Sequence, residues 1–218
     1  MTTPRETVVT PHLGTASKLE VFFDVSSPWT YLGFEGVIPL AREMGIEPEW
    51  RPILVGGVFN SVNPSVYQAR ENPVPGKAAY SRKDMADWAR LYGLKIAHPP
   101  SVFPVNSVKA MRGCFVAQRE GCLVSYARAA FEAYWGEDRD LSRDDVLGDI
   151  VQSVGIDRTE FFEAIAAPET KEALRRTTDE LIARGGFGSP TFFVDENDMY
   201  FGNDRLLLLR HALERGRS

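Results

Sequence analysis

The chain has 218 residues, of which 44% are hydrophobic and 25% charged, and its formal net charge is -5 at pH 7. These values are typical of a soluble globular protein with one well-filled core, or of one domain with a large insertion, and they exclude disorder of the bulk. The charges are spread along the chain and no apolar run approaches the ~18 residues that span a bilayer, so we expect neither nucleic acid nor a membrane as partner.

The N-terminal part predicts a leader followed by a β-α-β unit. Residues 1 to 17 lack the apolar stretch of a signal peptide, so we expect a flexible leader on a cytoplasmic protein. Residues 19 to 25 are an apolar run rich in β-forming side chains, which predicts an internal strand. A helix over 28 to 43 begins with a proline and is followed by a glycine, and residues 46 to 54 predict a second strand. A helical connection of this length allows the two strands to be parallel.

The middle of the chain changes character. Residues 56 to 76 are rich in glycine, proline and asparagine and predict a loop. Helical spacing then dominates, because apolar residues recur at i, i+3, i+4 and i+7 between residues 85 and 92, and continue in helical spacing from 108 to 115. Residues 126 to 135 are apolar on nearly all sides, as in a central helix.

Two further helix starts are marked by a capping residue that an acid follows three positions later. Ser142 with Asp145 forms one such pair, and Asp157 with Glu160 forms the other. Another amphipathic pattern covers residues 170 to 184 and ends at two glycines. The middle of the chain is therefore predicted to be a helical block.

Strand patterns return near the C-terminus. Residues 191 to 194 predict a strand, 196 to 198 a turn and 199 to 201 its hairpin partner. A helix over 203 to 213 closes the chain.

The order of these elements predicts an α/β fold with a thioredoxin-like sheet. Two α/β halves separated by helices must meet in one sheet if either is to bury its faces. We place the thioredoxin-like domain at residues 18 to 60 and 171 to 218, and a large inserted helical domain at 61 to 170.

Several kinds of site have little support in the sequence. The two cysteines, Cys114 and Cys122, lie eight residues apart, which in a helix is ~12 Å and too far for a disulfide, so we expect reduced thiols. The three histidines are scattered, and there is no CxxC, P-loop or GxGxxG motif. The sequence therefore predicts no metal, haem or dinucleotide site.

Six short stretches carry a family resemblance. They are DVSSPWTYLG after the first strand, RPILVGGVF from residue 51, GKAAYSRKDMADWARLYGL from 76, FPVNS from 103, FGSPTFFVD from 187 and FGNDRL from 201. In this order and spacing they resemble the 2-hydroxychromene-2-carboxylate isomerase family, related to kappa-class glutathione transferases and to the DsbA-like branch of thioredoxin folds. The resemblance runs from about residue 19 to residue 213.

The resemblance implies a glutathione-dependent cis-trans isomerase of aromatic catabolism. In that family the glutathione thiolate adds to an unsaturated keto acid, a bond that has become single rotates, and the thiol leaves. A small aromatic keto acid or chromene carboxylate is then the expected substrate, and a homodimer the expected assembly. Two alternatives remain, a kappa-type glutathione transferase that releases a conjugate and a DsbA-like binding or chaperone module that catalyses nothing.

Ser27 is the candidate catalytic residue. Serine is a preferred helix cap, and a proline after it suits the first helical position, so capping alone explains Ser27. The resemblance implies in addition that Ser27 holds the glutathione thiolate, and the free N–H groups of a helix start favour an anion at the same place. Redox thioredoxins carry their own cysteine at this position, whereas here a thiol has to come from a ligand.

The resemblance also implies glutathione-binding residues near the C-terminus. Ser189 and Pro190 are expected to form a cis peptide bond whose backbone pairs with the cysteinyl part. Gly202, Asn203 and Asp204 are expected to hold the γ-glutamyl end, with free N–H groups for its carboxylate and Asp204 for its ammonium. Without the resemblance, Ser189 and Pro190 simply belong to a loop that leads into a strand. The residues from 202 to 204 would then be the end of a hairpin followed by a helix cap.

The substrate side of the site is expected in the helical insert. Lys77 matches a lysine that in relatives faces the carboxylates of cofactor or substrate, although such a lysine is usually a solvated charge. Asn72 and Asn106 are candidates for polar substrate contacts, because a buried amide needs partners. Four aromatic residues belong either to this pocket or, more simply, to the core: Trp88, Tyr92, Phe103 and Trp135.

Overall fold

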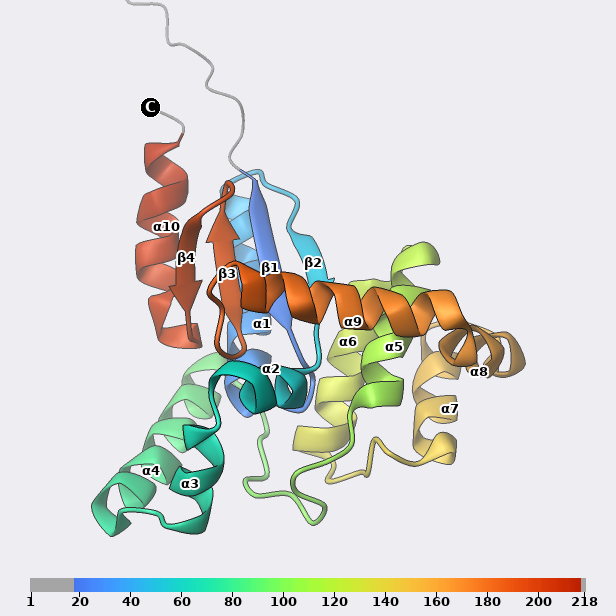
Figure 1. Cartoon of the computed structure of the whole chain (residues 1–218), viewed down its shortest axis with the longest axis horizontal. Helices are drawn as coiled ribbons and strands as arrows, with labels where there is room; N and C mark the ends of the chain where they lie inside the picture. The colour runs from blue at the N-terminus through green and yellow to red at the C-terminus, as the bar shows by residue number, and fades with distance from the viewer. Residues whose placement is uncertain (1–17, 217–218) are drawn as a thin grey trace, which may run out of the picture.

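A mixed four-stranded sheet is the centre of the molecule (Figure 1). The computed structural model describes residues 18–216, so the expected leader lies outside the described residues. The strand order is β2-β1-β3-β4, with β1 parallel to β2 and β3 antiparallel to both β1 and β4. The strands are β1 Leu19–Phe23, β2 Glu49–Pro52, β3 Thr191–Val194 and β4 Asp198–Phe201. The two predicted α/β halves therefore meet in one sheet, although β1 and β2 are shorter than expected.

Helix α1 Pro28–Glu43 connects β1 to β2 as predicted. The side chain of Ser27 caps its start, and Gly45 follows its end with φ 60°, a conformation that glycine adopts without steric cost. Buried side chains of α1 pack on the sheet and on the helical block. The ring of Tyr31, for example, stacks on that of Phe131 with centroids 4.8 Å apart.

The predicted loop over residues 56 to 76 is wrong. This segment forms α2 Val55–Val62 and α3 Ser65–Glu71, and α4 Pro75–Tyr92 begins at its end. Val58 of α2 is fully buried in a small apolar cluster with Phe22, Ile53, Leu181 and Phe193. Burial of this side chain offsets the low helix propensity of the two glycines in α2, which local composition alone does not reveal.

The middle of the chain is helical as predicted. The helices are α5 Val108–Arg119, α6 Leu123–Phe131, the π-helical turn η1 Glu132–Gly136, α7 Asp144–Ser153, α8 Arg158–Ala166 and α9 Pro168–Ala183. Asp157 caps α8 through the N–H groups of Thr159 and Glu160, which confirms that start. Ser142 does not cap α7, because its hydroxyl bonds to Asp140 and the helix begins two residues later. The domain boundaries near residues 60 and 170 stay a prediction.

A short 3-10 turn precedes the last helix. The predicted single helix over 203 to 213 divides into η2 Asn203–Arg205 and α10 Leu206–Arg215. Within residues 18–216 no helix is both long and apolar enough to cross a membrane.

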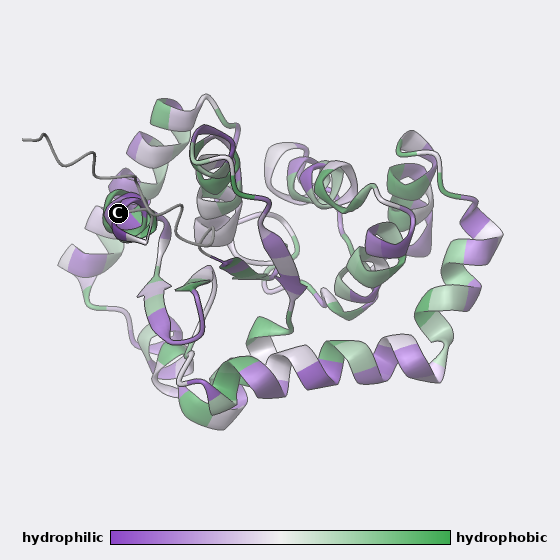
Figure 2. Ribbon diagram, turned by 90° about the horizontal axis from the view of Figure 1, so that it is seen from above, coloured by the Kyte–Doolittle hydropathy of each residue, from purple (hydrophilic) through white to green (hydrophobic). Residues whose placement is uncertain are grey.

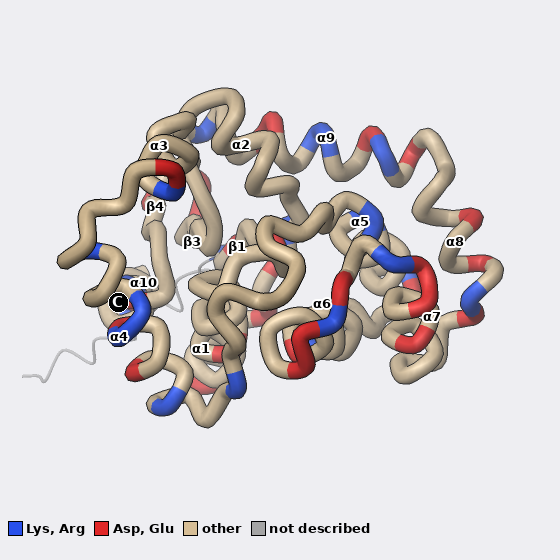
Figure 3. Tube along the Cα trace, turned by 90° about the horizontal axis from the view of Figure 1, so that it is seen from below, with Lys and Arg blue, Asp and Glu red and all other residues tan. Residues whose placement is uncertain are grey.

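Helix α9 lies across one face of the sheet, and its outer surface is polar. Figure 2 shows hydrophobic and hydrophilic residues alternating along this long helix at the lower edge of the view. Figure 3 shows acidic and basic residues spread over the helices rather than gathered in one patch. Buried Leu174 and Leu181 hold the inner face of α9 against the rest of the protein.

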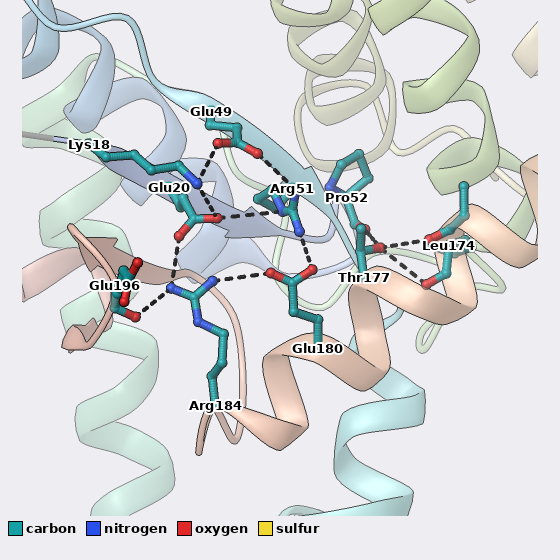
Figure 4. Close-up of polar contacts among 11 residues, drawn as sticks. Lys18, Glu20, Glu49, Arg51, Pro52, Leu174, Thr177, Glu180, Arg184 and Glu196 are labelled. Carbon is teal, nitrogen blue, oxygen red and sulfur yellow. Dashed lines mark hydrogen bonds and ion pairs between the residues drawn. The ribbon is translucent and has the colours of Figure 1, made fainter.

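A network of charged residues joins the sheet to α9 (Figure 4). Its centre is Glu20 on β1, whose side chain is only 4% exposed. Its carboxylate pairs with Arg184 at 2.8 Å, with Lys18 at 3.3 Å and with Arg51 at 3.8 Å. Glu180 of α9 pairs with both arginines. Because one buried carboxylate faces three cations, removal of its charge leaves them only the more exposed carboxylates of Glu49 and Glu180 as partners.

We expect Glu20→Gln to lower the free energy of unfolding by about 3 kcal/mol at neutral pH, because it breaks a buried ion pair. Burial acts to raise the pKa of Glu20, but hydrogen bonds and charges from Arg184 and Lys18 outweigh it and lower the pKa. The contribution of Glu20 is therefore present above the unfolded pKa of about 4.3 and is lost as pH falls through the lower folded pKa.

Urea unfolding of both proteins from neutral to acidic pH checks this expectation, since the difference between them should shrink in acid. Glu43→Gln is the matched control, because Glu43 pairs with Arg210 at 2.6 Å but its side chain is 59% exposed. An equal loss of stability in the two variants, or a difference that does not change with pH, would contradict the role given to Glu20.

Candidate functional site

Ser27 lies where β1 gives way to α1. Its Oγ accepts a hydrogen bond from the N–H of Thr30 at 3.2 Å and donates one to the carbonyl oxygen of Ser189 at 3.3 Å. The residue is half-buried, and the N-terminus of α1, which carries the partial positive charge of the helix dipole, lies at the same place. Ser27 is therefore a helix cap, and it also contacts the segment that the sequence predicted to lie beside it.

The Ser189–Pro190 peptide bond is cis, as expected, and packs against α1. A Cβ atom at Gly33 would lie only 2.7 Å from Cγ of Pro190. Helix α1 can therefore approach this proline so closely only because residue 33 is a glycine. The hydroxyl of Ser189 accepts from the N–H of Asp24 at 3.1 Å and shares a 2.7 Å hydrogen bond with that of Thr30. Ser189 thus uses its side chain to hold β1, α1 and β3 together.

Asp24 is a buried carboxylate at the end of β1 that the sequence analysis did not single out. It accepts hydrogen bonds from the N–H of Ser26 at 2.9 Å, the N–H of Val55 at 2.8 Å and the hydroxyl of Ser107 at 3.2 Å. Burial raises the pKa of Asp24, and these hydrogen bonds act in the opposite direction. The sequence did contain a signal for this role. An aspartate that directly follows an apolar, buried strand is itself buried, and a buried carboxylate needs several hydrogen-bond donors.

The segment after β4 brings a second predicted group to the site. The N–H of Gly202 donates to the carbonyl of Pro190 at 3.0 Å, and Gly202 has φ 100°. Asn203 is only 4% exposed, and its Nδ2 has no hydrogen-bond partner. Asp204 is exposed and pairs with Arg205. A buried amide donor without a partner is unfavourable by itself, and a ligand oxygen would satisfy it.

The three residues predicted for the substrate lie on the surface. Lys77 is in the first turn of α4, Asn72 ends α3, and Asn106 accepts from the N–H of Val108 at 3.1 Å. The two asparagines are exposed, so the expectation of buried amides is wrong. Among residues 18–216 no hydrogen bond or ion pair joins any of the three to Ser27.

The fold also brings a protein thiol close to the site without exposing it. Cys114 is fully buried on α5, and burial together with the charge of Asp24 raises its pKa well above that of a free thiol. Both cysteines are free, as expected. A protonated, inaccessible thiol is not a nucleophile, so Cys114 does not replace the cysteine that is absent at Ser27.

The family model of the DSBA-like thioredoxin domain matches residues 18–214. The chain belongs to the DSBA-like thioredoxin domain family. This membership confirms the predicted fold. Similarity to a solved structure of low sequence identity also confirms it. A probable DsbA oxidoreductase from Streptomyces coelicolor has a TM-score of 0.72 at 18% identity, covering 92% of this chain and 89% of that one.

Relatives within this family carry two kinds of name. The 2-hydroxychromene-2-carboxylate isomerase of Pseudomonas putida is 29% identical over 202 residues, 90% of this chain and 94% of the relative. Glutathione S-transferase kappa 1 of Homo sapiens is 27% identical, over 89% and 90% of the two chains. A solved 2-hydroxychromene-2-carboxylate isomerase has a TM-score of 0.76 at 26% identity, covering 90% and 94%. The resemblance stated from the sequence motifs is confirmed.

In this DSBA-like domain we expect Gly33→Ala to push Pro190 away from α1. Overpacking of this kind costs about 1–3 kcal/mol of unfolding free energy, which thermal or urea unfolding measures. Gly56→Ala is the matched control, since a Cβ at this helical glycine meets nothing within 4 Å. The close packing of Pro190 on α1 is refuted if the two variants are equally stable.

Proposed function

We propose that this chain is a glutathione-dependent isomerase acting on 2-hydroxychromene-2-carboxylate or a similar bicyclic aromatic acid. The observation that carries the proposal is the Ser27 hydroxyl, held at the N-terminus of α1 and 3.3 Å from the carbonyl oxygen of cis-bonded Ser189. Curated relatives that bear this isomerase name support the activity. Glutathione also appears in the names of kappa-class relatives.

Several residues of the site offer groups that would bind the tripeptide. The unpaired Nδ2 of Asn203 is a donor for an acceptor at the γ-glutamyl end, with Gly202 and Asp204 beside it. The Ser189–Pro190 backbone would pair with the cysteinyl part. When bound, glutathione supplies a thiolate that adds reversibly to the unsaturated keto acid and so allows a bond to rotate.

Ser27 and the start of α1 would keep that sulfur ionised. A free thiol has a pKa near ~8.5, and lowering it by two units takes about 2.7 kcal/mol of differential stabilisation. In this proposal the hydroxyl of Ser27 turns from the carbonyl of Ser189 to the sulfur and donates to it. The partial positive charge of the helix start adds to this hydrogen bond.

We expect Ser27→Ala to lower turnover by about 10- to 150-fold, because a hydrogen bond to a charged sulfur contributes roughly 1.5 to 3 kcal/mol. The ultraviolet absorbance of the bound thiolate should titrate at higher pH in the variant. Ser27→Gly separates catalysis from capping, since glycine caps nearly as well as serine while alanine costs about 1 kcal/mol of stability. Wild-type turnover in both variants, with an unchanged thiol titration, would remove Ser27 from the mechanism.

The products decide between the isomerase and its alternatives. An isomerase returns a product of the same mass as its substrate and leaves glutathione unconsumed, whereas a kappa-type transferase releases a conjugate with the mass of both. Mass spectrometry of the reaction therefore separates them. Calorimetry with glutathione tests the second alternative, a non-catalytic binding module. If the chain is such a module, we expect no binding of glutathione at millimolar concentration.

We expect Asn203→Ala to weaken glutathione binding by about 10-fold without lowering stability. Its buried Nδ2 has no partner in the free protein, so the substitution removes no hydrogen bond of Nδ2 there. In the complex, by contrast, it removes the proposed hydrogen bond to glutathione. Calorimetry with glutathione and thermal unfolding of the free protein measure the two effects. If stability falls and affinity does not, Asn203 has a structural role only.

The remaining expectations rest on the family resemblance. We keep Lys77, Asn72 and Asn106 as predicted contacts to the substrate or to the cofactor carboxylates. We likewise keep a homodimer and a cytoplasmic location as part of the proposal.

A further inference from the structure

Four ring side chains from separate segments gather near the site. We name them the aromatic wall: Phe59 of α2, His98 and Phe103 of the segment before α5, and Trp135 of η1. The centroid of the Phe103 ring lies 5.8 Å from that of His98 and 6.3 Å from that of Trp135, and the last two are 6.0 Å apart. Phe103 is 36% exposed whereas Trp135 is fully buried, so the wall is open to a ligand at Phe103 and Trp135 supports it from behind.

The aromatic wall is tied to the loop that carries Ser27. Nε1 of Trp135 donates to the carbonyl of Val25 at 2.9 Å, two residues before Ser27. Asp24 accepts from the N–H of Val55, where α2 begins, and from the hydroxyl of Ser107, just after the His98 and Phe103 segment. The segments that bear the wall therefore converge on the end of β1 from which α1 starts.

The lining of this region carries almost no charge of its own. Residues 52–69, 96–108 and 185–194 contain no lysine, arginine, aspartate or glutamate. Figure 3 shows the corresponding tube between α2, α3 and α6 uncharged over most of its length. Partial burial lowers the pKa of His98, and the nearby charge of Arg70 lowers it further.

Arg70 of α3 brings a cation to the wall. Its guanidinium carbon lies 5.3 Å from the ring centroid of Phe103 and 5.8 Å from that of Phe59. Two rings thus orient a side chain that is otherwise exposed. Among residues 18–216 no carboxylate forms an ion pair with Arg70. Its hydrogen-bonding fork is therefore available to an external anion.

We propose that Arg70 is the specificity-determining residue that binds the carboxylate of a bicyclic aromatic substrate while Phe103, the exposed ring of the aromatic wall, contacts its rings. This inference rests on the proposed function and names the group that selects an acid over a neutral ring system. A guanidinium held by two rings matches the planar carboxylate in a bidentate way, which a lysine ammonium does not. The exposed Lys77, in the first turn of α4, makes no ring contact among the described residues.

A pair of stable probes tests the assignment without turnover. Coumarin-3-carboxylate is a bicyclic acid, and coumarin-3-carboxamide is its neutral counterpart of nearly the same shape. We expect the full-length wild-type protein, titrated by fluorescence with glutathione present, to bind the acid about 10-fold or more tightly than the amide. Arg70→Ala should bind both equally, and Arg70→Lys should keep part of the preference.

Two further variants give the assignment its controls. Arg82→Ala removes an exposed arginine of α4 and should leave the acid preference unchanged. Phe103→Leu should weaken both probes and keep the preference, because it alters the wall rather than the cation. With the natural acid as substrate, Arg70→Ala should raise KM about 10-fold or more with little change in kcat.

The inference is overturned if Arg70→Ala retains the acid preference, or if wild type binds neither probe. Circular dichroism shows whether each variant is folded, and Arg70→Lys decides the matter should the alanine variant unfold. A wild-type protein that prefers the acid through Arg70 but isomerises nothing with glutathione would disprove the proposed function and leave the carboxylate site standing.

Discussion

The arrangement of the site depends on one buried carboxylate. Asp24 ends β1 and receives hydrogen bonds from the start of α1, the start of α2 and the residue before α5. Removing a carboxylate from water is costly, so its oxygens require these donors, and the donors in turn fix three segments that are distant in sequence. The loop bearing Ser27, the helix bearing Phe59 and the segment bearing Phe103 are therefore positioned by the same group.

A second set of hydrogen bonds connects Asp24 to the residues that would bind a ligand. The N–H of Asp24 donates to the hydroxyl of Ser189, which also bonds to that of Thr30 in the first turn of α1. Ser27 closes the set by donating to the carbonyl of Ser189. Because each partner lies beside a strand end or at a helix start, the Ser27 oxygen is positioned before any ligand arrives, and in the proposal only its O–H has to turn to the sulfur.

Local sequence patterns were enough to predict the start of α1 and the C-terminal hairpin. The serine before the proline at residue 28 is a cap in the structure, and the hairpin strands lie within one residue of the predicted positions. Burial that comes from distant residues was not visible in the sequence. Helix α2 forms in a glycine-rich segment because Val58 packs against β1 and β3, and Arg70 contacts Phe103 across a distance in sequence that local patterns do not cover. Asn106, by contrast, makes a local turn instead of a buried contact.

The chemistry of the site follows from where sulfur is and is not available. A protein cysteine at the start of α1 can form a disulfide with a second thiol, which suits redox exchange. Here that position holds the oxygen of Ser27, while the nearby thiol of Cys114 is buried and stays protonated. An external thiolate bound at Ser27 would therefore have no reactive Cys114 thiol with which to form a disulfide. In the proposed reaction this thiolate adds to the substrate, a bond rotates, and the thiolate leaves again.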